Sequence, residues 1–94
     1  MSKSLMQDEK ECLLCGATEA LHRHHIFFGT GNRALSETDG CWCYLCAYHH
    51  NMSGNGVHFN KNIDNKLKQI CQIKWEAKYG NREKFIRRYG KSYL

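Results

Sequence analysis

Two short cysteine and histidine pairs, far apart in the chain, constrain the fold of this sequence more than any other feature. Cys12 and Cys15 are separated by two residues, as are Cys46 and His49, and 30 residues lie between the two pairs. This spacing allows each pair to turn both of its side chains onto a single ion. The sequence therefore predicts one tetrahedral zinc site that brings the two pairs together.

The cysteines are better explained by metal binding than by a disulfide framework. Residues 1–11 are polar and charged, without the apolar stretch of a secretory signal, so we expect reduced thiols in a cytoplasm. A chain of 94 residues buries a small core, and a structural metal would add stability. Cys41 and Cys43 compete for the ligand role, because Cys43 also has the required spacing to Cys46. We prefer Cys46 with His49, since that pair leads into a predicted helix, and we place Cys71 in the core.

The net charge of +5 is distributed unevenly along the chain. Residues 1–40 carry four Lys/Arg and six Asp/Glu, whereas residues 41–94 carry ten and three, so the net charges are −2 and +7. A basic segment favours nucleic-acid binding through the phosphates, although it can also serve only solubility. No apolar run approaches the roughly 20 residues of a membrane span. The candidate phosphate contacts are Arg23, Arg33, Lys61, Lys66, Arg87, Arg88 and Lys91.

The hydrophobic pattern predicts an α+β chain. Residues 20–28 and 41–45 are expected to form two antiparallel strands, and residues 46–52 to begin a helix. Between the strands, residues 29–40 are rich in turn-forming residues and predict a long polar loop that Leu35 anchors.

The strongest helical pattern spans residues 61–79, where apolar side chains recur every four positions. Residues 53–56 are expected to interrupt the helix that begins over residues 46–52, before this long helix starts. Gly80 should end it, and Asn81 should cap a last short helix that stops at Gly90. The side chains expected to point inward from these two helices are Ile63, Leu67, Cys71, Trp75, Tyr79, Phe85, Ile86 and Tyr89.

Histidines cluster beside the zinc pairs. His24 and His25 lie near the end of the first predicted strand, and His50 directly follows the zinc ligand His49. Alternation along a strand sends His24 and His25 to opposite faces, so we expect one to bind a metal and the other to act as a base. We interpret His22 as a histidine without a site role. Three imidazoles near a zinc clamp, on a basic chain, suggest a second metal that acts on phosphate.

The residues around these histidines resemble a known family. Residues 21–26 (LHRHHI) and 44–51 (YLCAYHHN) are similar to the HNH, or ββα-metal, endonucleases in their zinc-knuckle form. The long helix and residues 85–91 (FIRRYGK) resemble small HNH-type proteins encoded by bacteriophages. The family motif covers residues 12–52.

The resemblance implies a role for individual histidines. His24 and His50 would hold a catalytic divalent ion such as Mg²⁺, Mn²⁺, Ni²⁺ or Zn²⁺, and His25 would be the general base. His58 follows glycines that would let it fold back as a third ligand or as a phosphate contact, with a surface or capping role as the alternative. The middle Asn of the family is missing, because no Asn lies between Asn32 and Asn51.

Together these inferences predict a small zinc-stabilised ββα-metal (His-Me finger) domain. It would comprise a flexible arm (1–11), the zinc knuckles and ββα core (12–52) and a helical C-terminal extension (53–94). The expected function is a metal-dependent DNA endonuclease of phage or prophage origin, which nicks DNA with low sequence specificity in the bacterial cytoplasm, alone, as a homodimer or with a phage DNA-processing partner. The alternatives are a non-catalytic zinc module that binds nucleic acid or docks a partner, and a purely structural zinc domain. The three histidines favour the enzyme, since a structural domain does not need them.

Overall fold

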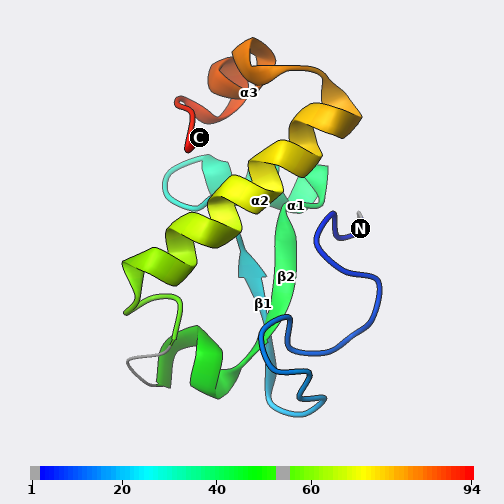
Figure 1. The fold of residues 1–94 in the computed structure, drawn as a ribbon, viewed down its shortest axis with the longest axis vertical. Coiled ribbons are helices and arrows are strands. Elements are labelled where there is room, and N and C mark those ends of the chain that lie inside the picture. Colours follow the sequence, from blue (N-terminus) through cyan, green and yellow to red (C-terminus); the bar gives the residue numbers. More distant parts are fainter. Residues whose placement is uncertain (1–2, 53–55) are drawn as a thin grey trace.

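A two-stranded antiparallel sheet and four helical segments make up the chain in a computed structural model that describes residues 3–52 and 56–94. In chain order the elements are β1 (Leu21–His25), α1 (Asn32–Asp39), β2 (Trp42–Cys46), the π-helical η1 (Tyr48–Met52), α2 (Lys61–Tyr79) and α3 (Arg82–Tyr89) (Figure 1). The predicted α+β class, the antiparallel strand pair and the long helix are confirmed. Of the predicted interruption before that helix, residues 53–55 lie outside the described residues.

Strand register decides which histidines share a face. β1 and β2 pair from Leu21 opposite Cys46 to His25 opposite Trp42. Because side chains alternate along a strand, His22 and His24 lie on one face of β1, and Arg23 and His25 lie on the other. β1 is shorter than predicted because it ends at His25, although the N–H of Ile26 still donates to the Cys41 carbonyl at 2.8 Å.

The core lies between the sheet and the two C-terminal helices. Leu67, Cys71 and Trp75 of α2 are buried against Phe27, Cys41, Cys43 and Leu45, together with Phe85 and Tyr89 of α3. Asn60 and Asn81 cap α2 and α3 with their side chains, and Gly90 ends α3 in the left-handed conformation. Tyr79 and Ile86, which were expected to point inward, are instead 39% and 40% exposed.

The predicted polar loop between the strands was wrong over most of its length, because α1 occupies residues 32–39. The buried residues of α1 are Ser36 and Asp39, so the helix has no apolar periodicity that a sequence pattern could detect. It contacts the segment after β1 through a hydrogen bond from Ser36 Oγ to the carbonyl of Phe27 at 2.6 Å. Leu35 packs against the core, as predicted.

The N-terminal residues cover the free edge of β2. The N–H of Leu5 donates to the carbonyl of Gly40 at 2.8 Å, and Tyr44 N–H donates to Gln7 Oε1 at 2.6 Å. The Lys3 carbonyl lies so close to Gly40 that a Cβ there would collide with it, and the φ of 82° also favours glycine. The segment therefore protects a strand edge that would otherwise be open to pairing. Residues 1–2 of the predicted arm lie outside the described residues.

None of the helices in the described part of the chain combines the length and the apolar character that crossing a membrane would require.

Two candidate metal centres and an adjoining pocket

The two predicted zinc pairs meet at the end of the sheet where β1 begins and β2 ends. The ligand atoms of Cys12, Cys15, Cys46 and His49 all lie within 4.8 Å of one another. Cys15 Sγ is 3.8 Å from Cys46 Sγ, and His49 Nδ1 is 3.3 Å from Cys46 Sγ and 3.8 Å from Cys12 Sγ. Zn–S bonds of about 2.3 Å at tetrahedral angles would place two sulfurs about 3.8 Å apart. The four residues therefore fit a metal such as zinc.

Local backbone structure prepares this group for a metal. The chain turns back after Cys12, where the N–H of Gly16 donates to the Cys12 carbonyl at 2.8 Å. Burial disfavours the Cys12 thiolate, but hydrogen bonds from the backbone of Cys46, Leu14 and Cys15 outweigh it and lower the pKa of the thiol to about 6. Because the thiolate is the form that binds metals, these surroundings favour the required ionisation state of Cys12. For Cys15, a backbone hydrogen bond from Ala17 lowers the pKa, but the side chains of Cys12 and Cys46 together with burial outweigh it and raise the pKa.

A second group contains the three imidazoles of His24, His50 and His58, whose ligand atoms also lie within 4.8 Å of one another. His50 Nε2 and His58 Nε2 are 3.0 Å apart. His24 is 2% exposed, and its Nε2 atom is buried without a hydrogen-bond partner. An unpartnered buried nitrogen is costly, and a metal bound by the three nitrogens would satisfy it. The donor set therefore fits a second metal ion.

Three separate structural features bring these imidazoles together. His24 lies on the inner face of β1 opposite Cys43, and His50 belongs to η1. His58 lies beside His50 because Val57 N–H donates to the His49 carbonyl at 2.8 Å and His58 N–H donates to the His50 carbonyl at 3.2 Å. The backbone thus folds His58 back onto the group, which favours the site role over the surface or capping role.

The surroundings keep two of these imidazoles neutral, which metal binding requires. Burial, with a smaller contribution from the charges of His50 and His58, lowers the pKa of His24 to about 3. Burial and the charges of His58 and His22 lower the pKa of His50 to about 4.

His22, which was predicted to have no site role, contacts this group through His50. Its Nδ1 lies 2.8 Å from His50 Nδ1, so it can fix the tautomer that leaves His50 Nε2 available to a metal. The signal in the sequence was the alternation that puts His22 on the same strand face as His24.

A pocket of about 230 Å³ opens beside the second group. It is lined by Arg23, His24, His25, Phe28, Arg33, His50 and His58. The structure thus brings the predicted base, His25, and two of the predicted phosphate contacts next to the imidazole group. His25 Nε2 is 3.2 Å from Glu37 Oε1, a residue that sequence reasoning missed because it lies in the predicted loop.

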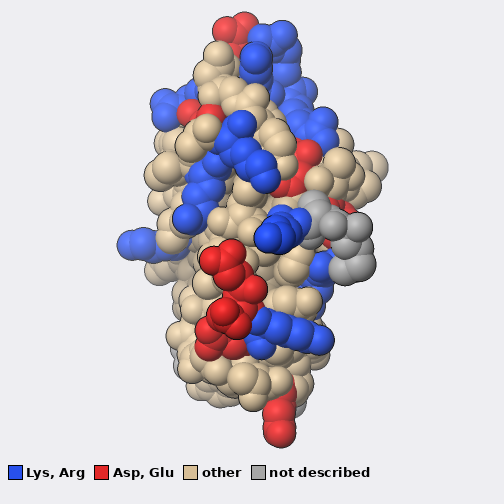
Figure 2. All heavy atoms as spheres, turned by 90° about the vertical axis from the view of Figure 1, so that its right-hand side faces the viewer, with Lys and Arg blue, Asp and Glu red and all other residues tan. Residues whose placement is uncertain are grey.

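The other predicted phosphate contacts are spread over the C-terminal helices. Lys61, Lys66 and Lys91 are exposed, and Arg87 pairs with Glu83 at 3.2 Å on the surface of α3. Arg88 instead donates two hydrogen bonds to the buried carboxylate of Asp39, so its charge is largely used within the protein. Figure 2 shows Lys and Arg side chains gathered towards the α3 end of one face, with Asp and Glu clustered below its middle.

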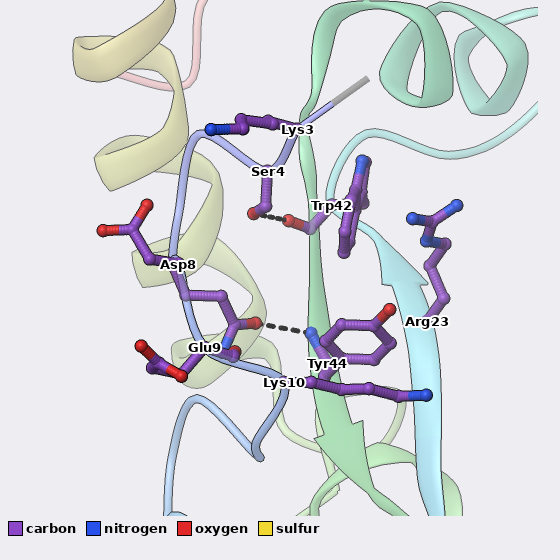
Figure 3. Close-up of a pocket in the computed structure, with 9 residues that line it drawn as sticks. Lys3, Ser4, Asp8, Glu9, Lys10, Arg23, Trp42 and Tyr44 are labelled. Carbon is purple, nitrogen blue, oxygen red and sulfur yellow. Dashed lines mark hydrogen bonds between the residues drawn. The ribbon is translucent and has the colours of Figure 1, made fainter. Parts of the chain in front are cut away.

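A larger pocket, about 430 Å³, lies between the N-terminal segment and β2 (Figure 3). Its charged lining residues are Lys3, Lys10, Arg23, Asp8 and Glu9, and its lining contains no histidine or cysteine that could hold a metal. The smaller, histidine-lined pocket is therefore the better candidate for phosphate chemistry.

Comparison with known proteins finds no family model, no curated protein and no solved structure that matches this chain. The fold and the site define a class: a small α+β chain with a two-stranded antiparallel sheet and cysteine and histidine groups suited to metal binding.

Proposed function

We propose that this protein is a metal-dependent DNA endonuclease of the HNH, or ββα-metal, type, with a structural zinc at Cys12, Cys15, Cys46 and His49. The observation that carries the proposal is the pocket in which His24, with its unpartnered Nε2, meets His50, His58 and His25. The order β1, β2, η1 supports it, because both strands and the helical segment contribute to the two metal groups.

Each residue of the pocket has a distinct role in the proposed reaction. His24, His50 and His58 would hold a divalent cation, which supplies Lewis-acid stabilisation of negative charge on the scissile phosphate. His25 would accept a proton from water while the water oxygen attacks phosphorus and the bond to the 3′ oxygen breaks. Arg33 is exposed at the rim of the same pocket and would hold a non-bridging phosphate oxygen.

The proposed substrate is DNA held mainly through its phosphates. The exposed lysines and arginines of α2 and α3 would neutralise the backbone without reading bases, so we expect nicking with low sequence specificity. One pocket per chain would cut one strand, and cutting both strands would need a homodimer or a partner protein. A phage or prophage origin and a bacterial cytoplasmic location belong to this proposal.

The test is nicking of supercoiled plasmid by purified protein with Mg²⁺, Mn²⁺, Ni²⁺ or Zn²⁺. We expect His25→Ala to abolish nicking while its zinc content and circular dichroism spectrum stay as in the wild type. His58→Ala should weaken binding of the second ion and leave the structural zinc in place. Asn65→Ala, a change at an exposed residue of α2 that alters no charge, is the purification control and should nick normally.

Two results would contradict the proposal. Unchanged nicking by His25→Ala would show that His25 is not the base. A wild-type protein that binds DNA but does not nick it with any ion would instead support a non-catalytic nucleic-acid-binding module.

A further inference from the structure

We propose that Glu37 is the residue that positions His25, an inference that rests on the proposed nuclease function. Glu37 Oε1 lies 3.2 Å from His25 Nε2. An ionised carboxylate can only accept hydrogen bonds, so the hydrogen of the neutral imidazole must lie on Nε2. This tautomer leaves the lone pair on Nδ1, and that is the nitrogen able to take a proton from water.

The carboxylate of Glu37 is itself held in place. Arg23 Nη1 donates to both of its oxygens, at 3.0 and 3.1 Å. The guanidinium of Arg23 lies 3.6 Å from the ring centre of Trp42, which keeps the arginine over the outer face of the sheet (Figure 3). Arg23 and His25 share that face of β1, and α1 carries Glu37 across to both of them.

Glu37 is ionised under the conditions in which it would act. Burial opposes ionisation, but the hydrogen bond from His25 and the charge of Arg23 outweigh it and hold the pKa of Glu37 below its ordinary value. Its side chain is 37% exposed, so ion pairing alone would add little stability. The arrangement is therefore better suited to fixing the orientation of His25 than to stabilising the fold.

The experiment compares Glu37→Ala and Glu37→Gln with Glu83→Gln, a matched control that alters an exposed glutamate paired with Arg87 at 3.2 Å on α3. Nicking kinetics are measured with Mn²⁺, and the tautomer of His25 is read from ¹⁵N NMR of histidine-labelled, zinc-loaded protein. The His25 signal is assigned with His25→Asn. In Glu37→Ala we expect kcat to fall about 100-fold without a rise in KM, and the single His25 tautomer to become a mixture. Glu37→Gln keeps an acceptor and should retain more activity, and Glu83→Gln should match the wild type.

The two readouts separate the failure of this inference from the failure of the proposed function. If Glu37→Ala keeps both the wild-type kcat and a His25 hydrogen on Nε2, Glu37 is not a positioning residue. A raised KM with unchanged kcat would also overturn the inference, because it would place Glu37 in substrate binding. If the wild type does not nick DNA at all, the proposed function fails, and the NMR comparison still decides whether Glu37 fixes the tautomer.

Discussion

The two ends of this molecule are held together by different chemistry. At the end with η1, four side chains that could hold a metal converge, and three of them are cysteines. Towards α3, the buried carboxylate of Asp39 accepts hydrogen bonds from Trp75 Nε1 at 2.9 Å, Tyr89 Oη at 2.8 Å and Arg88 Nε and Nη2 at 2.6 and 2.8 Å. One end gathers side chains suited to a metal ion, whereas the other connects its elements through hydrogen bonds between its own side chains.

This difference shows where the stability of so short a chain comes from. The Asp39 carboxylate joins the end of α1 to α2 and α3, beside an aromatic cluster that includes Phe27 and Phe85 at 5.1 Å between ring centres. At the other end, residues 12–20, which include Cys12 and Cys15 of the four-residue Cys/His group, contain neither helix nor strand. We therefore expect the two ends to respond in opposite ways to metal removal and to substitution of Asp39.

The largest effect is expected from removal of the structural zinc. Such metals contribute on the order of 10 kcal/mol in zinc-finger peptides, and small domains have total stabilities of only about 5 to 15 kcal/mol. Cys46→Ser should therefore lose both the zinc and the cooperative thermal transition. Metal analysis and circular dichroism would measure these changes.

Cys43→Ala is the matched control for this experiment, because Cys43 is equally part of β2 but lies outside the four-residue group. It should keep one structural zinc and lose only a little stability. Loss of zinc from Cys43→Ala, with zinc retained in Cys46→Ser, would exchange the two ligand assignments.

The next effect concerns the other end of the molecule. Asp39→Asn would leave an amide that cannot accept all four hydrogen bonds, so donors of Trp75 or Tyr89 would lose their partners. We expect a loss of about 3 kcal/mol in the free energy of unfolding, with zinc content unchanged. Chemical denaturation of zinc-loaded protein would measure it. Glu83→Gln, at an exposed ion pair, should change stability by less than about 0.5 kcal/mol, and an equal loss in both variants would contradict the role of Asp39.

The two ends of the molecule also differ in how well the sequence predicted their contacts. The spacing of Cys12, Cys15, Cys46 and His49 defines their grouping, because each pair is local and the chemistry of zinc is specific. The contacts of Asp39 come from residues 36 to 50 positions later, and no local pattern indicates them. The apolar periodicity predicted a helix over residues 61–79, which are the observed bounds of α2. The prediction succeeded because the row of buried side chains on this helix is apolar.

The candidate site shows the same contrast between local patterns, which could be predicted, and long-range contacts, which could not. Strand alternation correctly separated His24 from His25. It did not reveal Glu37, because α1 buries polar residues and was predicted as a loop. The placement of His58 depends on two backbone hydrogen bonds from residues after η1, and these have no signature in the sequence. Glu37 now provides His25 with a partner in a chain that lacks the middle Asn of the HNH pattern.

The contribution of Asp39 to stability should also depend on pH. Burial opposes ionisation of Asp39, but hydrogen bonds from Arg88, Trp75 and Tyr89 hold its pKa below the ordinary value. A carboxyl whose pKa is lowered by folding stabilises the protein above its unfolded pKa of about 3.9, and this contribution is lost as the pH falls through the folded pKa. The difference in stability between wild type and Asp39→Asn should therefore be constant from about pH 8 to 5 and shrink below about pH 4. Denaturation curves in excess zinc would test this, and a difference that grows in acid would contradict it.

The smallest effect is expected at the start of α3, where Asn81 Oδ1 accepts a hydrogen bond from Lys84 N at 2.9 Å. Asn81→Ala should lower the free energy of unfolding by about 1 kcal/mol, because the N–H at the first turn loses its partner. Asn81→Gly should lower it by only a few tenths of a kcal/mol, since glycine exposes that N–H to water.

Asn60 caps α2 by accepting hydrogen bonds from Asn62 N and Ile63 N at 3.1 and 3.2 Å, and it lies two residues from His58. Asn60→Ala should therefore also weaken binding of the second metal ion, which Asn81→Ala should leave unchanged. Equal ion affinities in the two alanine variants would show that the start of α2 does not help to hold His58 in place.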